Sequence, residues 1–391
     1  MSLRVRSLTA VRAAIPLKRT IKHASKVRTD NDALLVRCEL SDGSVGWGEG
    51  LSRAYVTGDT PEAAWAAVCG TLDAGCPLGG FESVGDAATA TEPWHVRGNA
   101  ADPRLAFGNP ARCAVELAVL DAAGRSTGES LTDLASRMTG GRPVLDGVRY
   151  GVVGSPARRR KLAWSGLRAR LYGFPDVKFK VGLDGHDDAA CLRALRSGLG
   201  RSIDLRVDAN EAWAADDVER RVAAIRPLGV SSVEQPCPHA EVGRLAGVRA
   251  NLGVPVMLDE SLCSMVDAEA AVAGGTCDLF NVRVSKCGGL LPTLRLLEFA
   301  RQEGVGCQLG CMVGETGILS AAGRAVACSQ PDLRHLEGSY DRHLVAEPLT
   351  RDDLTFRRGG RAPRLVGGGL GIEVDEAAVR RVTKESRTWT W

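Results

Sequence analysis

The feature that most constrains this fold is a regular series of short β-rich runs after residue 130. They centre near Tyr150, Phe179, Arg206, Val233, Met257, Val282, Cys307 and Leu336. Successive centres lie 24 to 29 residues apart, and helical patterns fill several of the gaps. Repeated β-then-α units produce parallel strands with crossover helices, and eight units close a (β/α) barrel. We therefore expect an α/β barrel. An open doubly wound sheet is the alternative, but residues 154–158 (GSPAR) lack its glycine-rich phosphate turn.

The flanking regions have a different pattern. Residues 34–39 and 45–49 predict two strands joined by a hairpin turn at Asp42 and Gly43, and residues 110–125 predict a helix. After residue 345 the series stops, and glycines between 359 and 371 leave no eighth helix. We expect an α+β domain at 1–130, the barrel at 131–345, and a segment at 346–391 that returns to the first domain.

Overall composition excludes several classes of protein. The 391 residues contain 50 Lys and Arg against 47 Asp and Glu, so nothing global indicates a nucleic-acid or anionic-membrane partner. No apolar run is long enough for a membrane span, and the N-terminus has no signal-peptide pattern. The 12 cysteines include no CxxC pair, which predicts buried free thiols and a cytoplasmic location.

Three carboxylates stand at equivalent places after successive runs: Asp208, Glu234 and Asp259. The carboxyl ends of barrel strands meet at one mouth, where three such acids repel one another unless a cation lies among them. Oxygen-only ligands favour Mg²⁺, with Mn²⁺ as the alternative. The other interpretation is that each acid caps the helix that follows it.

Lysines border this acidic group on two sides. Lys178 and Lys180 are two residues apart and share one strand face, whereas Lys286 follows the sixth run, across the barrel. Burial is expected to lower the pKa of such lysines, unless they simply extend to solvent at the rim. A cation that stabilises an enediolate and a lysine base fit removal of the proton α to a carboxylate. Lysines on both faces predict a racemase or epimerase.

At these residues the sequence resembles the enolase superfamily, within it the muconate-lactonizing-enzyme subgroup of the mandelate racemase family. The motifs that carry the resemblance are KFK (178–180), DANEAW (208–213), VEQP (233–236), LDES (258–261), SKCGG (285–289), GCMVGET (310–316), GSVGWGEG (43–50) and AVELAVLDAAG (114–124). The resemblance implies a (β/α)₇β modified TIM barrel with an α+β capping domain, and a homo-oligomer. The N-terminal pattern looks closest to that of dipeptide epimerases.

The resemblance also implies roles for individual residues. Asp208, Glu234 and Asp259 are the implied metal ligands, and Lys180 and Lys286 the implied acid–base pair, with Lys178 as the electrostatic partner of Lys180. Supporting roles fall to Asn210, Glu260 and Glu315.

Substrate choice is expected to lie in capping-domain loops. Residues 18–28 are basic and include Lys22, His23, Lys26 and Arg28, and Tyr55 lies in a second loop. A basic lid predicts a substrate with a second anionic group or an acyl oxygen, unless these charges are merely solvated. Glu337 and Asp341 stand where dipeptide epimerases carry a differently spaced pair of aspartates.

We therefore expect an isomerase that racemises or epimerises an amino-acid derivative or dipeptide-like small-molecule carboxylate. Three alternatives remain: a cycloisomerase of a muconate-like diacid, a lyase that dehydrates a hydroxy acid or acid sugar, and a non-catalytic metal-binding protein.

Overall fold

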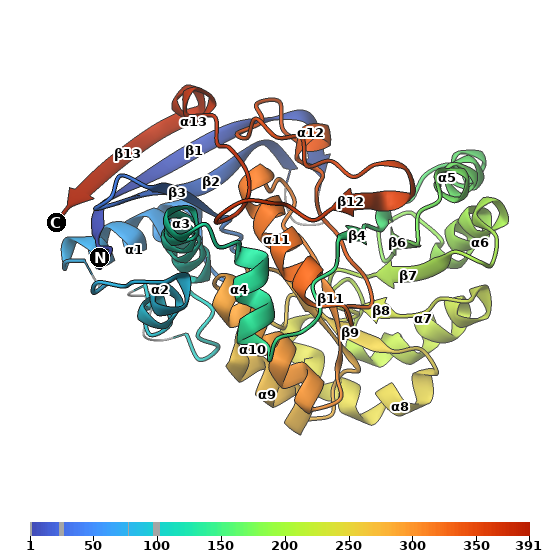
Figure 1. Ribbon diagram of the computed structural model, residues 1–391. Coiled ribbons are helices and arrows are strands. Elements are labelled where there is room, and N and C mark those ends of the chain that lie inside the picture. Colours follow the sequence, from blue (N-terminus) through green and yellow to red (C-terminus); the bar gives the residue numbers. More distant parts are fainter. Residues whose placement is uncertain (1, 23–26, 77, 97–101) are drawn as a thin grey trace.

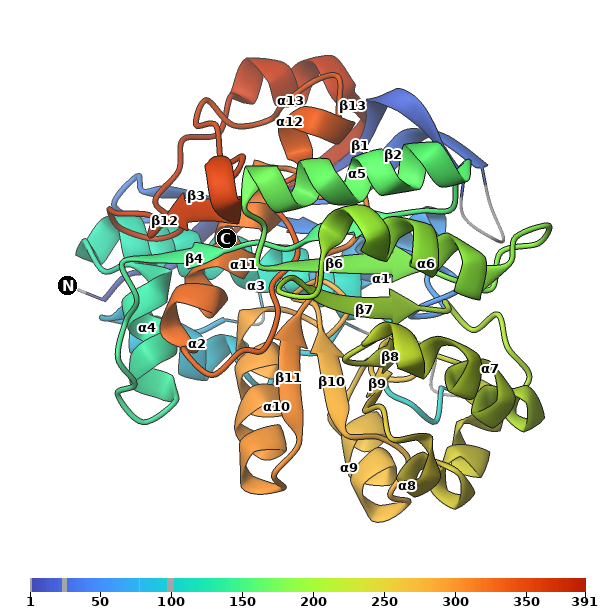
Figure 2. The ribbon, with the colours of Figure 1, turned by 90° about the vertical axis from the view of Figure 1, so that its right-hand side faces the viewer.

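Two sheets organise the molecule (Figures 1 and 2). The computed structural model describes all residues except 1, 23–26, 77 and 97–101, and it leaves the side chains of residues 21, 22, 27 and 28 undescribed. A four-stranded antiparallel sheet has the order β13-β1-β2-β3, and a seven-stranded parallel sheet has the order β11-β10-β9-β8-β7-β6-β5. The first sheet belongs to a capping region, and the second curls into the barrel.

The capping region follows the predicted pattern closely. Its strands and helices are β1 (Val5–Lys22), β2 (Val27–Leu40), β3 (Val45–Gly50), α1 (Pro61–Asp73), α2 (Val84–Thr91) and α3 (Asn109–Thr127). Helix α3 packs so closely on β3 that a Cβ added at Gly48 would lie 1.9 Å from the Ala114 carbonyl oxygen. The glycines of the GSVGWGEG run therefore allow this helix to approach the sheet.

The parallel strands of the barrel are β5 (Val152–Gly154), β6 (Asp176–Lys180), β7 (Asp204–Asp208), β8 (Val233–Glu234), β9 (Val256–Leu258), β10 (Leu279–Val282) and β11 (Gly306–Leu309). The helices outside them are α5 (Arg159–Tyr172), α6 (Asp188–Leu199), α7 (Val218–Ile225), α8 (Arg249–Leu252), α9 (Met265–Ala273), α10 (Leu290–Gln302) and α11 (Gly317–Ser329). The modified barrel fold is thus confirmed.

The first and eighth runs of the series differ from expectation. Tyr150 lies between β4 (Gly147–Arg149) and β5, and the eighth run is reduced to a parallel bridge between Leu336 and Leu309. On its other side, the Leu336 carbonyl oxygen accepts a hydrogen bond of 2.8 Å from the Gly151 amide. Backbone hydrogen bonds to β11 on one side and to Gly151 on the other therefore close the ring.

After Glu337 the chain leaves the barrel. It forms α12 (Asp341–Leu344), β12 (Arg361–Pro363), α13 (Glu376–Val382) and β13 (Thr383–Thr390). Strand β12 pairs with β4, and β13 pairs antiparallel with β1. Figure 1 shows β13 beside β1 at the outer edge of the capping sheet. Between α3 and β4, helix α4 (Leu131–Met138) connects the capping region with the barrel.

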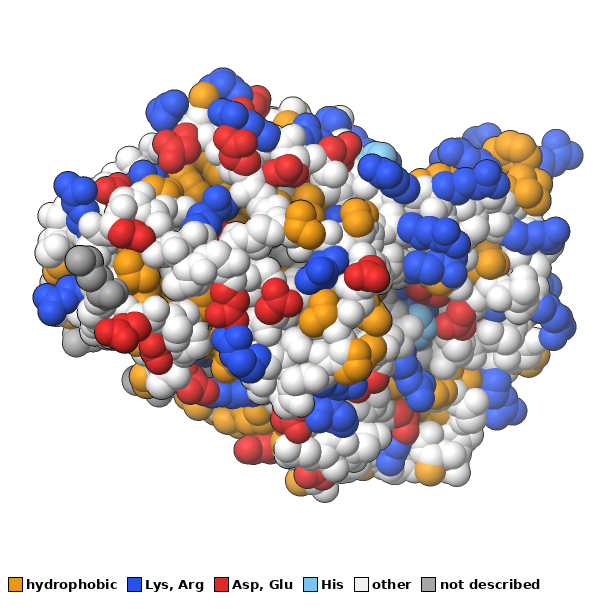
Figure 3. Space-filling view, in the orientation of Figure 1, with side chains coloured by type: hydrophobic (Ala, Val, Ile, Leu, Met, Phe, Trp, Pro, Cys, Tyr) orange, Lys and Arg blue, Asp and Glu red, His pale blue; other side chains and the backbone are white. Residues whose placement is uncertain are grey.

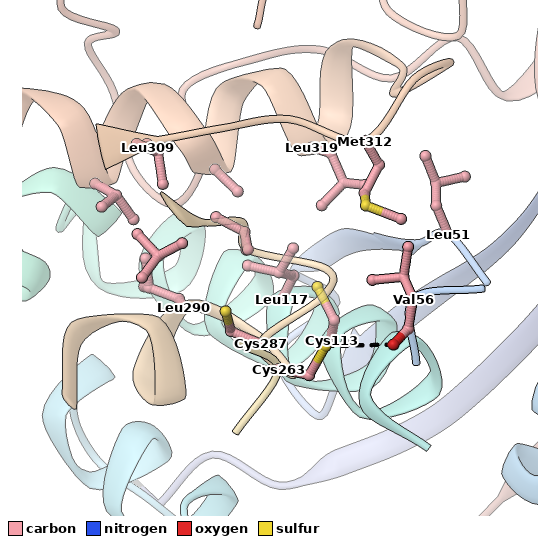
Figure 4. Packing of buried hydrophobic residues seen from close by; sticks show 14 of the residues in the cluster. Leu51, Val56, Cys113, Leu117, Cys263, Cys287, Leu290, Leu309, Met312 and Leu319 are labelled. Atoms are coloured by element: carbon pink, nitrogen blue, oxygen red, sulfur yellow. Dashed lines mark hydrogen bonds between the residues drawn. The ribbon is translucent and has the colours of Figure 1, made fainter. Parts of the chain in front are cut away.

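The hydrophobic core runs without interruption from the capping region into the barrel. Figure 4 shows Leu51, Val56 and Leu117 of the capping region facing Cys287 and Leu319 of the barrel. All twelve cysteines are free, and most are buried, as their apolar surroundings predict. This shared core fixes the capping loops over the mouth of the barrel.

Basic side chains gather on the outer face of α5 and α6, at the upper right of Figure 3. Helix α5 (sequence RRKLAWSGLRARLY) carries no acidic residue, and its Trp164 is 58% exposed.

In the described part of the chain, none of the helices is long and apolar enough to cross a membrane.

Candidate functional site

The candidate active site lies at the carboxyl ends of β6 to β10. Lys180, Asp208 and Glu234 share one level of the barrel, because Lys180 pairs with Asp208 and Asp208 pairs with Glu234 in the strand register. Paired residues of parallel strands direct their side chains to the same face. Asp259 follows directly after β9, and the three carboxylates are almost completely buried. The predicted alignment of acids on neighbouring strands is therefore present.

Lys178 lies deeper in the barrel and binds three acids. Its Nζ is 2.9 Å from Glu337 Oε2, 3.1 Å from Glu234 Oε1 and 3.4 Å from Asp208 Oδ2. Burial alone lowers the pKa of this ammonium, but the attraction of these carboxylates outweighs burial and raises the pKa above its usual value. The expectation that burial lowers the Lys178 pKa is therefore wrong.

Lys180 connects to a second row of polar groups. Its Nζ donates to Asn210 Oδ1 at 2.5 Å, and Asn210 Nδ2 donates to Glu260 Oε1 at 3.2 Å. Asn210 has a φ of 42°, in the left-handed region that asparagine tolerates better than most residues. This turn directs the Asn210 amide back over the end of β7, where it lies between Lys180 and Glu260.

Lys286 approaches from the other side of the acidic group. Strands β6 and β10 are four strands apart in the sheet, and Lys286 follows β10. Its fully buried Nζ donates to Asp259 Oδ1 at 2.9 Å and to the carbonyl oxygens of Asp259 and Asn281, both at 2.7 Å. Burial, assisted by the nearby Arg283, lowers its pKa to about 8. The expected depressed lysine is therefore found at this position.

The carboxylates of the group repel one another. Burial, and then the charges of Asp208 and Glu234, raise the pKa of Glu260 to about 7. Its Oε2 is buried without a hydrogen-bond partner among the described residues. Burial also disfavours charge on Asp208, but Lys178 and Lys180 outweigh it and lower the Asp208 pKa.

This donor set fits a divalent cation. Oxygen-only ligands, deep burial and the unpartnered Glu260 oxygen are features that a Mg²⁺ site requires. As the side chains stand, however, Asp208, Glu234 and Asp259 each turn toward a lysine or arginine. Among the described residues, no group of three acids or other ligating side chains converges on one point.

Several site residues were not predicted from the sequence. Arg206 on β7 lies between Asp176, at 2.9 Å, and Glu337, at 2.8 Å. Asn281 Nδ2 donates to Glu234 Oε1 at 2.7 Å. Arg283 pairs with Asp259. The signal for Arg206 and Asn281 is a charged or amide side chain between apolar residues of a strand, as in LRV and LFNV. Arg283 directly follows such a strand.

The remaining predicted residues have different surroundings. Glu315 is close to the mouth, where its Oε1 accepts from the Met312 amide at 2.6 Å and burial raises its pKa to about 8. Glu337 is held inside the barrel by Lys178 and Arg206. Asp341 is buried at the start of α12, and neither of its carboxylate oxygens has a hydrogen-bond partner among the described residues.

The capping loops lie close to this mouth. Tyr55 precedes Val56, whose carbonyl oxygen accepts from Cys263 Sγ at 3.4 Å (dashed line in Figure 4). The Leu51 amide donates to Ser285 Oγ at 2.8 Å, next to Lys286. The basic residues predicted to contact substrate lie outside the described side chains: Lys22, His23, Lys26 and Arg28.

The loop between β11 and α11 is held by capping side chains. Asn31 Nδ2 donates to the Gly314 carbonyl oxygen at 2.6 Å, and Arg53 donates to the Val313 carbonyl oxygen at 2.9 Å. Glu49 on β3 accepts from the Thr316 amide at 3.0 Å and from the Leu319 amide at 3.1 Å, at the first turn of α11. The capping sheet therefore positions the loop that carries Glu315.

Comparison with known proteins identifies the family. Residues 164–378, more than half of the chain, match the family described as "Enolase C-terminal domain-like". The chain is 28% identical over 343 residues to a hydrophobic dipeptide epimerase from Enterococcus faecalis, covering 87% of this chain and 92% of that protein. It is 27% identical over 386 residues to an N-succinyl-L-Arg/Lys racemase from Bacillus cereus, covering 94% and 95%.

Solved structures share the whole architecture. The N-succinyl Arg/Lys racemase from Bacillus cereus superimposes with a TM-score of 0.86 at 23% identity, over 99% of this chain and 100% of that one. A dipeptide epimerase from Cytophaga hutchinsonii, complexed with Mg and the dipeptide D-Ala-L-Val, gives a TM-score of 0.83 at 21% identity, over 98% and 99%. Together with the strand-end carboxylates and lysines, these matches show that the chain belongs to the enolase superfamily, with the C-terminal barrel of the mandelate racemase and muconate-lactonizing enzymes.

Proposed function

We propose that this protein is a Mg²⁺-dependent racemase or epimerase that acts at the α-carbon of an amino-acid derivative or dipeptide-like substrate. The observation that carries the proposal is the placement of Lys180 and Lys286 on opposite sides of one buried carboxylate group. Inversion at carbon needs a proton acceptor on one face and a donor on the other. The epimerases and racemases among the relatives support the same chemistry.

We assign Asp208, Glu234 and Asp259 as the metal ligands. When bound, Mg²⁺ would supply Lewis-acid stabilisation for the negative charge that develops on the substrate carboxylate. Lys180 and Lys286 exchange the α-proton at their Nζ atoms. A pKa of about 8 leaves Lys286 partly neutral near neutral pH, as a base requires. Lys178, held charged by its three carboxylates, adds fixed positive charge beneath the acidic group.

We further propose that the substrate nitrogen is acylated rather than a free ammonium. A substrate ammonium needs an acidic partner, but Glu337 already binds Lys178 and Arg206 within 3 Å. Asp341 is buried at the first residue of α12, and the charges that act on it come from Arg342, Asp353 and Arg324, outside the acidic group. Glu315, whose raised pKa favours the neutral acid, is a hydrogen-bond donor suited to an acyl oxygen. N-acyl amino acids are therefore expected to react faster than dipeptides with a free amino terminus.

Isotope exchange tests the reaction. Purified protein with Mg²⁺ in D₂O is given matched panels of N-acyl amino acids and free dipeptides, and NMR follows deuterium at the α-carbon together with the ratio of stereoisomers. We expect exchange accompanied by inversion. Lys286→Met should reduce exchange by roughly 10²- to 10⁴-fold for one stereoisomer, and Lys180→Met for the other. Lys161→Met, on the exposed face of α5, is the matched control and should keep full activity.

Two outcomes would contradict the proposal. The inversion chemistry is wrong if no panel member exchanges while Mg²⁺ is bound, or if both lysine variants keep wild-type rates. The preference for acyl substrates is wrong if free dipeptides react faster than their acylated counterparts.

We also propose that the protein forms a homo-oligomer in a reducing compartment. Its twelve free cysteines support the compartment. Light scattering coupled to size-exclusion chromatography tests the assembly, and a monomeric mass would contradict it.

A further inference from the structure

Helix α3 of the capping region reaches the barrel beside the turn that carries Lys286. Asn109, the first residue of this helix, is buried. Its Nδ2 donates to the carbonyl oxygens of Lys286 and Cys263, both at 2.8 Å. A side-chain amide nitrogen has two protons to donate, so both donors of Asn109 are used here. One side chain of the capping region thus holds the main chain of Lys286.

The two carbonyl groups belong to different barrel loops. Lys286 stands in the turn after β10, and Cys263 stands in the loop after β9, which also carries Asp259. Lys286 Nζ in turn donates to Asp259 Oδ1 at 2.9 Å. The Asn109 amide therefore joins the main chains of two neighbouring loops whose side chains meet in the candidate site.

The turn after β10 packs tightly against α3. A Cβ added at Gly288, which has a φ of 94°, would lie 2.8 Å from Asn109 Oδ1. A Cβ added at Gly289 would lie 2.3 Å from Glu116 Oε1, and this oxygen accepts from the Leu291 amide at 3.0 Å. The two glycines therefore let polar side chains of α3 contact the main chain of the turn directly.

The two lysines of the site are supported in different ways. Lys180 is the last residue of β6, and its main chain pairs with Asp208 within the sheet. Lys286 stands beyond the end of β10, where its main chain belongs to no strand. It depends on hydrogen bonds from outside the sheet, and Asn109 supplies one of them. Loss of the Asn109 amide should therefore displace Lys286 and leave Lys180 in place.

We propose that Asn109 is a positioning residue for Lys286, through which the capping helix α3 sets the rate of one of the two proton transfers. Lys286 has to present its Nζ to one face of the α-carbon, and a displacement of about 1 Å from the productive geometry costs about 10²-fold in rate. The inference rests on the proposed function, because it requires Lys286 to be one of two opposed acid–base groups.

Isotope exchange of separate stereoisomers tests the role. Each stereoisomer of an N-acyl amino acid is incubated with protein and Mg²⁺ in D₂O, and NMR follows initial loss of the α-proton together with formation of the other stereoisomer. Lys286→Met and Lys180→Met first identify which stereoisomer each lysine deprotonates. Asn109→Ala should slow exchange of the stereoisomer that Lys286 deprotonates by about 10- to 100-fold, through kcat rather than KM.

The other stereoisomer provides an internal control. Lys180 removes its α-proton, so exchange should stay close to the wild-type rate in Asn109→Ala. Its inversion should nevertheless slow, because Lys286 has to return the proton on the opposite face. Exchange with retained configuration should therefore exceed inversion, which a general loss of stability would not produce.

Two further variants separate positioning from stability. Asn109→Asp keeps the shape of the side chain but loses both donors, so it should slow the Lys286 direction at least as much as alanine does. Gln330→Ala removes another buried amide, which donates to Thr139 Oγ1 at 2.9 Å after the end of α11. It should lower the thermal midpoint without changing the ratio of the two exchange rates. Asn109→Ser replaces Asn109→Ala if the alanine variant does not fold.

Different outcomes separate this inference from the proposed function. If Asn109→Ala slows both stereoisomers by the same factor, or neither, while each lysine variant still affects its own stereoisomer, the positioning role is wrong and the proposed function stands. If neither lysine variant favours one stereoisomer, the pair of opposed lysines is wrong, and the role of Asn109 falls with it.

Discussion

Replacing Glu49 by glutamine tests how the capping sheet holds the barrel. Glu49 lies on β3, is fully buried, and accepts hydrogen bonds at the first turn of α11. Burial raises its pKa to about 7, against an ordinary value of 4.5, although bonds from Thr316 and Leu319 oppose the change. The folded protein therefore favours the protonated acid more than the unfolded chain does.

The size and sign of the effect follow from this difference. Because the folded pKa lies above the unfolded value, the stabilisation is fully present below pH 4.5 and is lost as the pH rises through about 7. One pKa unit corresponds to 1.36 kcal/mol, so ionisation of Glu49 lowers the free energy of unfolding by roughly 3 kcal/mol between these limits. Glutamine cannot ionise, so Glu49→Gln should lack this part of the pH dependence. Glu116 accepts a hydrogen bond at the first turn of α10 and has a similarly raised pKa. It is present in both proteins, so its contribution to the pH dependence of stability cancels in the comparison.

Urea denaturation at pH 5, 6, 7 and 8 measures the difference directly. Tryptophan fluorescence and circular dichroism should be followed together, because coincident transitions justify a single free energy. The stability of Glu49→Gln relative to wild type should rise by about 2.5 kcal/mol from pH 5 to pH 8. Glu82→Gln, at an exposed position, should give a constant difference. A difference for Glu49→Gln that stays constant across this range would refute the reasoning.

Four further predictions follow from the site. Glu337→Gln leaves Lys178 and Arg206 with less compensation in the barrel and should destabilise the protein by about 3–5 kcal/mol in denaturant titrations. Chelation with EDTA should abolish α-proton exchange and lower the thermal midpoint, and added Mg²⁺ should restore both; exchange that persists in EDTA would contradict a metal role. In the direction in which Lys286 removes the proton, the pH–rate profile should rise and reach half its plateau near pH 8, because the neutral amine is the base. Asn31→Ala removes a hydrogen bond of 2.6 Å to Gly314 and should raise KM more than it lowers kcat; an unchanged KM would exclude a positioning role for this loop.

The barrel and its charged strand ends could be predicted because local patterns determine them. Six of the eight predicted centres, such as Phe179 and Cys307, lie inside strands, since each is a short β-branched or apolar run between helical patterns. The carboxylates and lysines could be placed because a parallel barrel brings all strand ends to one mouth. The eighth run contributes only a bridge, because Leu336 has polar and glycine neighbours that do not favour a longer strand.

The partners of each charge could not be predicted in this way. The Lys178 pKa rises because Glu337 and Glu234 meet it from strands far apart in the sequence, and no spacing rule reports that contact. Arg283 appears from sequence to be one more basic residue after a strand. Only the three-dimensional arrangement shows that its guanidinium lies against Asp259. Burial and pairing act in opposite directions on a buried charge, so the sign of a pKa shift depends on the fold.

The pairing of β13 with β1 has a consequence for how the molecule is made. The two strands are nearly the full length of the chain apart, so β1 emerges from the ribosome long before the strand that covers its edge. Until then β1 presents unpaired amide and carbonyl groups that can recruit another chain. Removal of the last eight residues should therefore promote aggregation during synthesis, even though the barrel and its chemical groups would remain intact in sequence.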